Sequence, residues 1–174
     1  PVLPATGHTR KRIRRRIREL RSQVVRDPDP QAVEHHMKDI YSHIETHVDE
    51  SIDQLFELVR QPSISAQKLG FDRAPGLVME LLKRNGFEAE IVPVPNDGLP
   101  TVYGYMPASS QKVDPQSAPT LLFYCHYDVQ PVDPLELWDT DPFEPTRVGD
   151  RLYGRGMSDD KGNIGARLAS IRAF

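Results

Sequence analysis

The sequence predicts an α/β fold, a three-layer sandwich in which helices cover a mixed β-sheet. Stretches with apolar residues at every third or fourth position, typical of amphipathic helices, lie before and after a group of short strand-like runs. The 16 prolines among 174 residues argue against an all-helical bundle, because proline interrupts helices. The chain begins with Pro1 and stops at Phe174 inside a predicted helix, so we expect the fold to be truncated.

Residues 1–30 are expected to form a basic, flexible tail. Between Arg10 and Arg26 nine basic side chains stand against one acid, Glu19, although the whole chain has a net charge of −3. Such a block is either a solvated arm or a segment that binds an anionic partner. Because no aromatic residue lies within it, base stacking is not available, and nucleic acid is not the expected partner.

Residues 31–174 are expected to form one domain with its own core. No apolar run is long enough to span a membrane, and no charged-then-apolar signal segment is present. Cys125 is the single cysteine, which excludes an internal disulfide and fits a reducing compartment. We therefore expect a cytoplasmic protein without a membrane partner.

The first predicted helical region spans residues 31–60, which contain no glycine or proline. Its apolar residues recur in steps of three and four and the pattern stops before Pro62, which predicts one amphipathic helix or two consecutive ones. A further helix fits residues 72–85. Asp72 is its expected N-cap, and Gly86 suits the left-handed position that follows the last turn.

Three strand-like runs follow these helices. Residues 88–94 and 101–106 lie on either side of a turn-rich segment, which predicts two neighbouring strands. Residues 120–125 form a nearly continuous apolar run of the kind found in the buried middle of a sheet. A last helix is expected after Asp159, because apolar residues there recur on one face.

The first segment with chemical potential directly follows the predicted buried strand. His126 would lie at the carboxyl end of that strand, where open α/β sheets commonly place ligand sites, and its imidazole can bind a metal. Asp128 points to the same side of an extended chain and could hold the other ring nitrogen of His126. In isolation, a histidine and an aspartate at a strand end are equally well explained as polar surface.

The second segment is an acidic pair, Asp159 and Asp160, at the start of the last predicted helix. Carboxylates at a helix N-terminus are favoured by the unpaired amides and the helix dipole, so simple capping is one interpretation. The other is a carboxylate that bridges two metal ions with its two oxygens. Asp159 could fill this role while Asp160 faces solvent.

Together, the two segments resemble the fingerprints of the M20 family of metallopeptidases. These are His-x-Asp-Val-x-Pro, beginning here at His126, and Gly-Arg-Gly-x-x-Asp-Asp-Lys-Gly, beginning at Gly154. The spacing between His126 and Asp159 also suits that family. The ending Asp-Asp-Lys-Gly looks closer to the carnosinase-like and nonspecific dipeptidase branch, and the resemblance covers residues 31–174.

This resemblance implies that residues 31–174 are the N-terminal part of a metallopeptidase catalytic domain with a zinc-peptidase-like fold. It also implies metal-dependent hydrolysis of dipeptides or short peptides. It implies that His126 is a ligand to one zinc ion and that Asp159 bridges two zinc ions, with Mn²⁺ or Co²⁺ as substitutes. Asp128 is the catalytic-site residue expected to orient His126. The full-length protein is expected to be a homodimer.

The resemblance also implies parts of the site that these residues lack. The family uses a general-base glutamate, a further carboxylate ligand, a distant histidine and a small dimerisation domain, all located after the second segment. We therefore expect the 174-residue fragment alone to be inactive and to bind zinc poorly, since a zinc site needs three or four protein ligands.

Two other functions stay open at this point. The family uses one site for several amides, so an N-acyl amino-acid deacylase is the alternative enzyme. A non-catalytic module that binds nucleic acid through the basic arm is the alternative outside enzymes.

Two further motifs are set aside. His43 and His47 are four residues apart, but no glutamate directly follows His43 as a His-Glu-x-x-His zinc helix requires, so both are expected to face solvent. Cys125 beside His126 is expected to be a small buried residue rather than a nucleophile.

Overall fold

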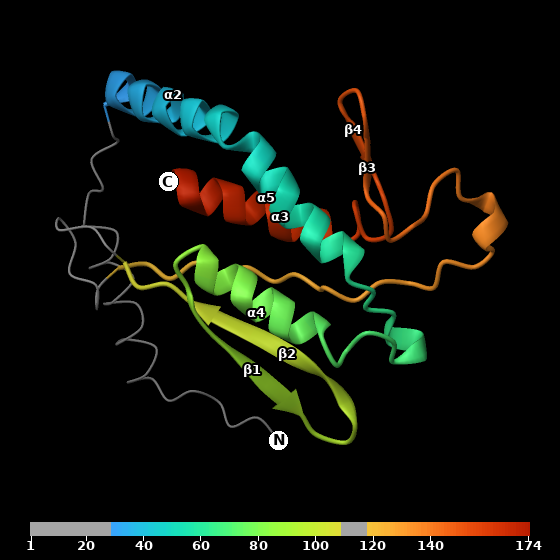
Figure 1. Ribbon diagram of the computed structural model, residues 1–174. Coiled ribbons are helices and arrows are strands. Elements are labelled where there is room, and N and C mark those ends of the chain that lie inside the picture. Colours follow the sequence, from blue (N-terminus) through green and yellow to red (C-terminus); the bar gives the residue numbers. More distant parts are fainter. Residues whose placement is uncertain (1–28, 109–117) are drawn as a thin grey trace, which may run out of the picture. The chain divides into compact units, whose positions relative to one another are not determined.

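The computed structural model describes residues 29–108 and 118–174 (Figure 1), so nearly all of the predicted basic tail lies outside the described residues. The chain divides into two compact units, Pro1–Lys38 and Asp39–Phe174. No helix in the described ranges is long and apolar enough to cross a membrane. In chain order the longer elements are α2 (Pro30–Thr46), α3 (Val48–Arg60), α4 (Ala74–Arg84), β1 (Glu88–Val94), β2 (Gly98–Tyr105), β3 (Thr146–Val148), β4 (Arg151–Tyr153) and α5 (Lys161–Ala173).

Of the first unit, the structure describes the beginning of α2. Pro30 is the first helical residue, a position where the missing N–H of proline would have no partner in any case. The Asp29 carboxylate accepts a hydrogen bond from the Gln31 N–H at 3.0 Å and so closes the first turn. An exposed ion pair between Lys38 and Glu34, 2.9 Å long, joins successive turns.

The helical region predicted for residues 31–60 is two helices, because α2 gives way to α3 at His47. In the second unit, α5 packs against α3, and α4 packs against the β1–β2 hairpin (Figure 1). The helices meet in a core whose buried side chains come from α3, α4 and α5: Leu58, Val78, Leu81, Ile164 and Leu168. The apolar stripes found in the sequence are therefore the faces by which these helices pack together.

The helix predicted over residues 72–85 is α4, although its beginning differs from the prediction. The residue before its first turn is Arg73, and no side chain caps it, so the assignment of Asp72 as N-cap is wrong. The prediction for the other end is confirmed, since Gly86 follows the helix with a φ of +88°. This left-handed residue turns the chain directly into β1.

The β1–β2 hairpin is the antiparallel pair predicted from residues 88–94 and 101–106. Ile91 pairs with Val102 in its register. Gly104 marks the point of closest approach to α4, because a Cβ at this position would lie 3.1 Å from Leu82 Cδ1. A larger residue there would require the Leu82 side chain to shift by a few tenths of an ångström.

The strand predicted for residues 120–125 is not formed, although the α/β class itself is confirmed. The segment is extended but pairs with no strand of the described residues, and Leu121 and Leu122 are 78% and 89% exposed. Both sheets that the described residues form are antiparallel and two-stranded, whereas a mixed sheet was predicted. The physical reason is that a central strand needs hydrogen-bonded neighbours on both sides, which the described residues do not supply.

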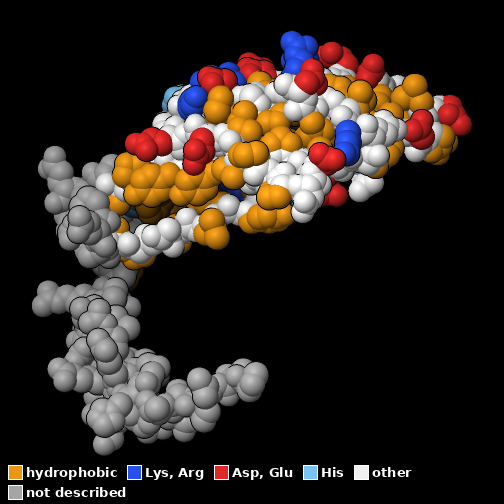
Figure 2. All heavy atoms as spheres, turned by 90° about the horizontal axis from the view of Figure 1, so that it is seen from below, with side chains coloured by type: hydrophobic (Ala, Val, Ile, Leu, Met, Phe, Trp, Pro, Cys, Tyr) orange, Lys and Arg blue, Asp and Glu red, His pale blue; other side chains and the backbone are white. Residues whose placement is uncertain are grey.

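Apolar side chains consequently remain at the surface, as the face shown in Figure 2 illustrates.

The β3–β4 hairpin, which the sequence did not predict, consists of two three-residue strands around a turn at Gly149. Such short strands contain too few residues for an alternating pattern to be recognised.

Candidate metal centre

The segment that contains His126 and Asp128 is held by the residues that follow α3. Ser63 is fully buried, its Oγ donates to the Tyr127 carbonyl at 2.6 Å, and its own carbonyl accepts from the Val129 N–H at 2.8 Å. Ile64 and Val129 form a parallel β-bridge. The chain is thus extended here, and the side chains of His126 and Asp128 point away from that of Tyr127.

Tyr127 anchors the opposite side of the same segment. Its hydroxyl donates a hydrogen bond to the Pro100 carbonyl of β2, and its ring packs against Phe71 with centroids 5.8 Å apart. Burial raises the pKa of Tyr127 to about 12, and the nearby negative charge of Asp128 acts in the same direction. Tyr127 is therefore a neutral packing residue, and the polar chemistry lies on the other face.

The structure brings the three predicted site residues together. His126 Nε2 lies 2.9 Å from Asp159 Oδ1, although the two residues are 33 positions apart in the sequence. The other ring nitrogen, Nδ1, lies 3.1 Å from the Asp128 carbonyl oxygen and 3.3 Å from Asp128 Oδ1. One imidazole therefore contacts an acid on each side.

The charges around His126 control its protonation. Burial alone would lower its pKa, but the Asp128 carbonyl and the negative charges of Asp128 and Asp159 outweigh burial, so the pKa of His126 is raised. The Asp159 side chain is 84% exposed, so its second oxygen is open to solvent. That oxygen is therefore accessible to a further ligand.

The donor set fits a zinc ion in part. Two ligands of one tetrahedral zinc ion, each at roughly 2.0–2.2 Å from the metal, lie roughly 3.3–3.6 Å apart. The 2.9 Å between His126 Nε2 and Asp159 Oδ1 is a hydrogen-bond distance, which would have to lengthen by about 0.5 Å for both atoms to bind one zinc ion. Imidazole nitrogen and carboxylate oxygen are ordinary zinc ligands. Among residues 29–108 and 118–174, however, no three or more His, Cys, Asp or Glu side chains cluster as a complete site. Among the described residues, His126 and Asp159 therefore offer two potential zinc ligands rather than a complete site.

Asp160 is a site residue that the sequence did not reveal, and the expectation that it faces solvent is wrong. Its Oδ2 accepts the backbone N–H of His126 at 3.0 Å, and its Oδ1 accepts a hydrogen bond from Asn163 Nδ2. Burial raises the pKa of Asp160, but these two hydrogen bonds outweigh burial and lower the pKa. Asp160 is the N-cap residue of α5, but its side chain makes no capping hydrogen bond to that helix. The carboxylate instead accepts the backbone N–H of His126.

The Gly-Arg-Gly turn brings the acidic pair to His126. Gly156 has a φ of +82°, and a Cβ there would lie 2.7 Å from Val129 Cγ1, so only glycine lets the turn pass the His126 segment. Arg155 Nη2 donates to the Pro131 carbonyl at 2.9 Å, and its guanidinium lies 4.9 Å from the centroid of the Trp138 ring. Arg155, at the end of the linker between the two segments, therefore contacts Pro131 at its beginning, and Trp138 is a packing residue between them.

The motifs that were set aside have structural explanations. The rings of His43 and His47 stack with centroids 4.1 Å apart, and both residues are half-buried, so the expectation that they face solvent is wrong. Stacking at the junction of α2 and α3 accounts for them without a metal. Cys125 is half-buried and lies beside Arg167 Nη1.

Comparison with known proteins relates this site to characterised enzymes. The family model described as Peptidase family M20/M25/M40 matches residues 122–174, a range that contains His126, Asp159 and the linker between them. A succinyl-diaminopimelate desuccinylase from Nitrosospira multiformis is 51% identical over 57 residues, which cover 33% of this chain and 15% of that protein.

Two solved structures are also similar. A M20 family metallo-carboxypeptidase from Sulfolobus solfataricus matches with a TM-score of 0.61 and 38% identity, covering 71% of this chain and 26% of that one. Human carnosine dipeptidase 1 matches with a TM-score of 0.65 and 30% identity, covering 79% of this chain and 30% of that one. The matched residues span between 15% and 30% of the length of these three proteins.

Proposed function

Because this chain belongs to peptidase family M20/M25/M40, we propose that it contributes part of the metal site of an enzyme that hydrolyses dipeptides or short peptides. The observation that carries the proposal is the contact between His126 Nε2 and Asp159 Oδ1 at 2.9 Å. It brings the two sequence segments together and places an imidazole nitrogen beside a carboxylate oxygen, so a small movement would let both bind one zinc ion. The rest of the ligand set and the group that accepts a proton from water would come from other parts of a longer protein.

Each of the three residues has a defined task under this proposal. His126 would be a ligand to one metal ion, and Asp159 would be the carboxylate shared by two metal ions. Asp128 accepts the Nδ1–H of His126, which fixes the tautomer that leaves Nε2 free for the metal. Two zinc ions, when bound, would supply an activated water molecule and polarise the scissile carbonyl, and Mn²⁺ or Co²⁺ would suit the same donors.

The choice between a dipeptidase and an N-acyl amino-acid deacylase depends on the chemistry beside the scissile amide. Similarity to a carnosine dipeptidase and a metallo-carboxypeptidase supports the first, and similarity to a desuccinylase supports the second. We favour the dipeptidase, because the Asp159-Asp160-Lys161-Gly162 sequence resembles the carnosinase-like and nonspecific dipeptidase branch of the family. The proposed partners are a dipeptide or short peptide substrate and a second copy of the full-length protein.

The substrate test compares unmodified dipeptides with N-acetylated and N-succinylated amino acids, using the longer protein that carries this chain. A kcat/KM that is higher for the dipeptides supports the dipeptidase. A preference for the acylated amino acids would overturn that choice and leave the metal site intact.

The site test compares His126→Ala and Asp159→Ala with wild type in the same protein. Both variants are expected to lose hydrolysis and zinc binding together, because each lacks a metal ligand. Asp150→Ala is the matched control, since Asp150 is exposed in the turn between β3 and β4. Full activity in either site variant would contradict the proposed function.

A further inference from the structure

Lys161, the first residue of α5, has an unusual position for a charged residue. It is 2% exposed, and its Nζ donates to the carbonyl oxygens of Leu58 at 2.8 Å and Gln61 at 2.7 Å. Leu58 lies in the last turn of α3, and Gln61 directly follows that helix. Carbonyl oxygens at these positions have no N–H partner within the helix. They also form the negative end of the helix dipole, which favours a cation.

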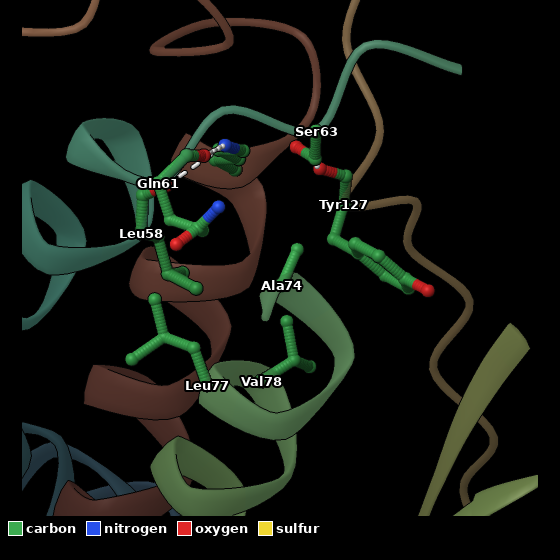
Figure 3. A pocket seen from close by; sticks show the side chains of 8 residues that line it. Leu58, Gln61, Ser63, Ala74, Leu77, Val78 and Tyr127 are labelled. Atoms are coloured by element: carbon green, nitrogen blue, oxygen red, sulfur yellow. Dashed lines mark hydrogen bonds between the residues drawn. The ribbon is translucent and has the colours of Figure 1, made fainter. Parts of the chain in front are cut away.

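The surroundings of this ammonium group explain why it stays buried. A small pocket, shown in Figure 3, is lined by Lys161 and by apolar side chains that include Leu58, Leu77 and Val78. The methylene groups of the lysine pack in this apolar space, while the charged end reaches the two carbonyls. Burial lowers the pKa of Lys161 to about 8, and the negative charge of Asp128 acts in the opposite direction.

Two glycines show that the turn before α5 is built around the Lys161 side chain. A Cβ on Gly156 would lie 3.2 Å from Lys161 Cδ, so the lysine fills the space that a side chain there would need. A Cβ on Gly162 would clash with the carbonyl oxygen of Met157. Residues 156–162 therefore close tightly around one buried side chain, and Asp159 and Asp160 lie within that closed turn.

We propose that Lys161 is the positioning residue of the metal centre: by joining the end of α3 to the first turn of α5, it fixes Asp159 and Asp160 opposite His126. This inference rests on the proposed function. Asp160 accepts the His126 N–H at 3.0 Å and Asp159 Oδ1 meets His126 Nε2 at 2.9 Å, so both contacts depend on where α5 begins. Lys161 touches neither metal nor substrate under this proposal, and it acts through the two aspartates that precede it.

The test replaces Lys161 with methionine in the longer protein that carries this chain. Methionine keeps the length of the side chain but removes both hydrogen bonds to α3. After removal of metal with a chelator, zinc affinity is measured by competition with a chelating dye, at a temperature where circular dichroism shows the variant folded. Zinc affinity is expected to fall by about 10–100-fold, as for other residues that orient metal ligands.

A second variant separates positioning from general loss of stability. Leu81 is 1% exposed in the same core and lies on α4, which carries none of the proposed metal ligands, so Leu81→Ala is expected to lower stability while keeping every ligand and both Lys161 hydrogen bonds. Zinc affinity of folded Leu81→Ala is expected to stay within about twofold of wild type. If folded Lys161→Met also binds zinc like wild type, the inference is overturned. If wild type itself binds no zinc, the proposed function fails instead.

Hydrogen exchange of wild type tests the same inference without any variant, should Lys161→Met fail to fold. Zinc held by Asp159 is expected to slow amide exchange at residues 58–61, because Lys161 transmits the restraint to the end of α3. The β1–β2 hairpin is the internal control, and its exchange should not change. Unchanged exchange at residues 58–61 when zinc binds would contradict the inference.

Discussion

Replacing Asp160 with alanine tests how the candidate metal centre is held together. The change removes the acceptor of the His126 N–H hydrogen bond, which is 3.0 Å long, and the acceptor of the Asn163 side chain. A hydrogen bond to a charged group contributes about 1.5–3 kcal/mol, and partial exposure of Asp160 to solvent places both bonds at the lower end. We expect Asp160→Ala to lower the free energy of unfolding by about 2–3 kcal/mol.

Urea unfolding followed by circular dichroism measures this loss at neutral pH. Asp160→Asn keeps the shape of the side chain and one acceptor oxygen. The stability of this variant should therefore lie between that of Asp160→Ala and that of wild type. Asp150→Ala, at an exposed turn, is expected to stay within about 0.5 kcal/mol of wild type. An Asp160→Ala protein as stable as wild type would refute the role assigned to this carboxylate.

The contribution of Asp160 also has a defined pH dependence. Although burial raises its pKa, the hydrogen bonds from Asn163 and the His126 N–H outweigh burial, so its pKa in the folded state is lower than in the unfolded state. The stability difference between wild type and Asp160→Ala should therefore be complete above the unfolded pKa and be lost as pH falls through the folded pKa. A difference that grows on acidification would contradict this assignment.

Three further substitutions test the packing that supports the site, and a fourth, Gly76→Ala, is a control. Leu81→Ala, at a side chain 1% exposed, should lower the free energy of unfolding by about 3 kcal/mol in urea. Gly162→Ala places a Cβ against the Met157 carbonyl and should lower the free energy of unfolding by about 1–3 kcal/mol. Its control is Gly76→Ala, which has no atom within 4 Å of the added Cβ and should leave thermal stability unchanged or slightly higher. Ser63→Ala removes the 2.6 Å hydrogen bond to Tyr127 and should cost about 1 kcal/mol, and an unchanged melting temperature would argue against this anchor.

The helices and the first hairpin could be predicted because their signals are local. The spacing of apolar residues predicted the α2–α3 region as a whole and α4 to within a few residues, but not the break between α2 and α3. Glycine at position 86 predicted the end of α4, and the structure gives it a left-handed φ of +88°. The three site residues His126, Asp128 and Asp159 could be named because their types and spacing form a recognisable motif. The structure places them together, with His126 between the two acids.

The remaining features depend on contacts that a linear sequence does not display. Residues 120–125 have the composition of a buried strand, but pairing depends on neighbours, and the described residues provide none. Asp159 and Asp160 are adjacent acids, and only the turn around Lys161 decides which one faces solvent and which one holds the His126 backbone. The burial of Lys161 could not be predicted either. Its hydrogen-bond partners are backbone carbonyls about 100 residues earlier in the chain, and no pattern of side chains in the sequence indicates them.

The central claim is that Asp159 bridges two metal ions beside His126, and metal stoichiometry tests it most directly. Native mass spectrometry of the longer protein, reconstituted with zinc after removal of all metal, counts the ions bound to each chain of wild type and of Asp159→Ala. We expect two zinc ions per chain in wild type and a loss of two-ion binding in the variant, because one carboxylate would be shared by both ions. An Asp159→Ala protein that still binds two zinc ions, or a wild type that binds none, would contradict it.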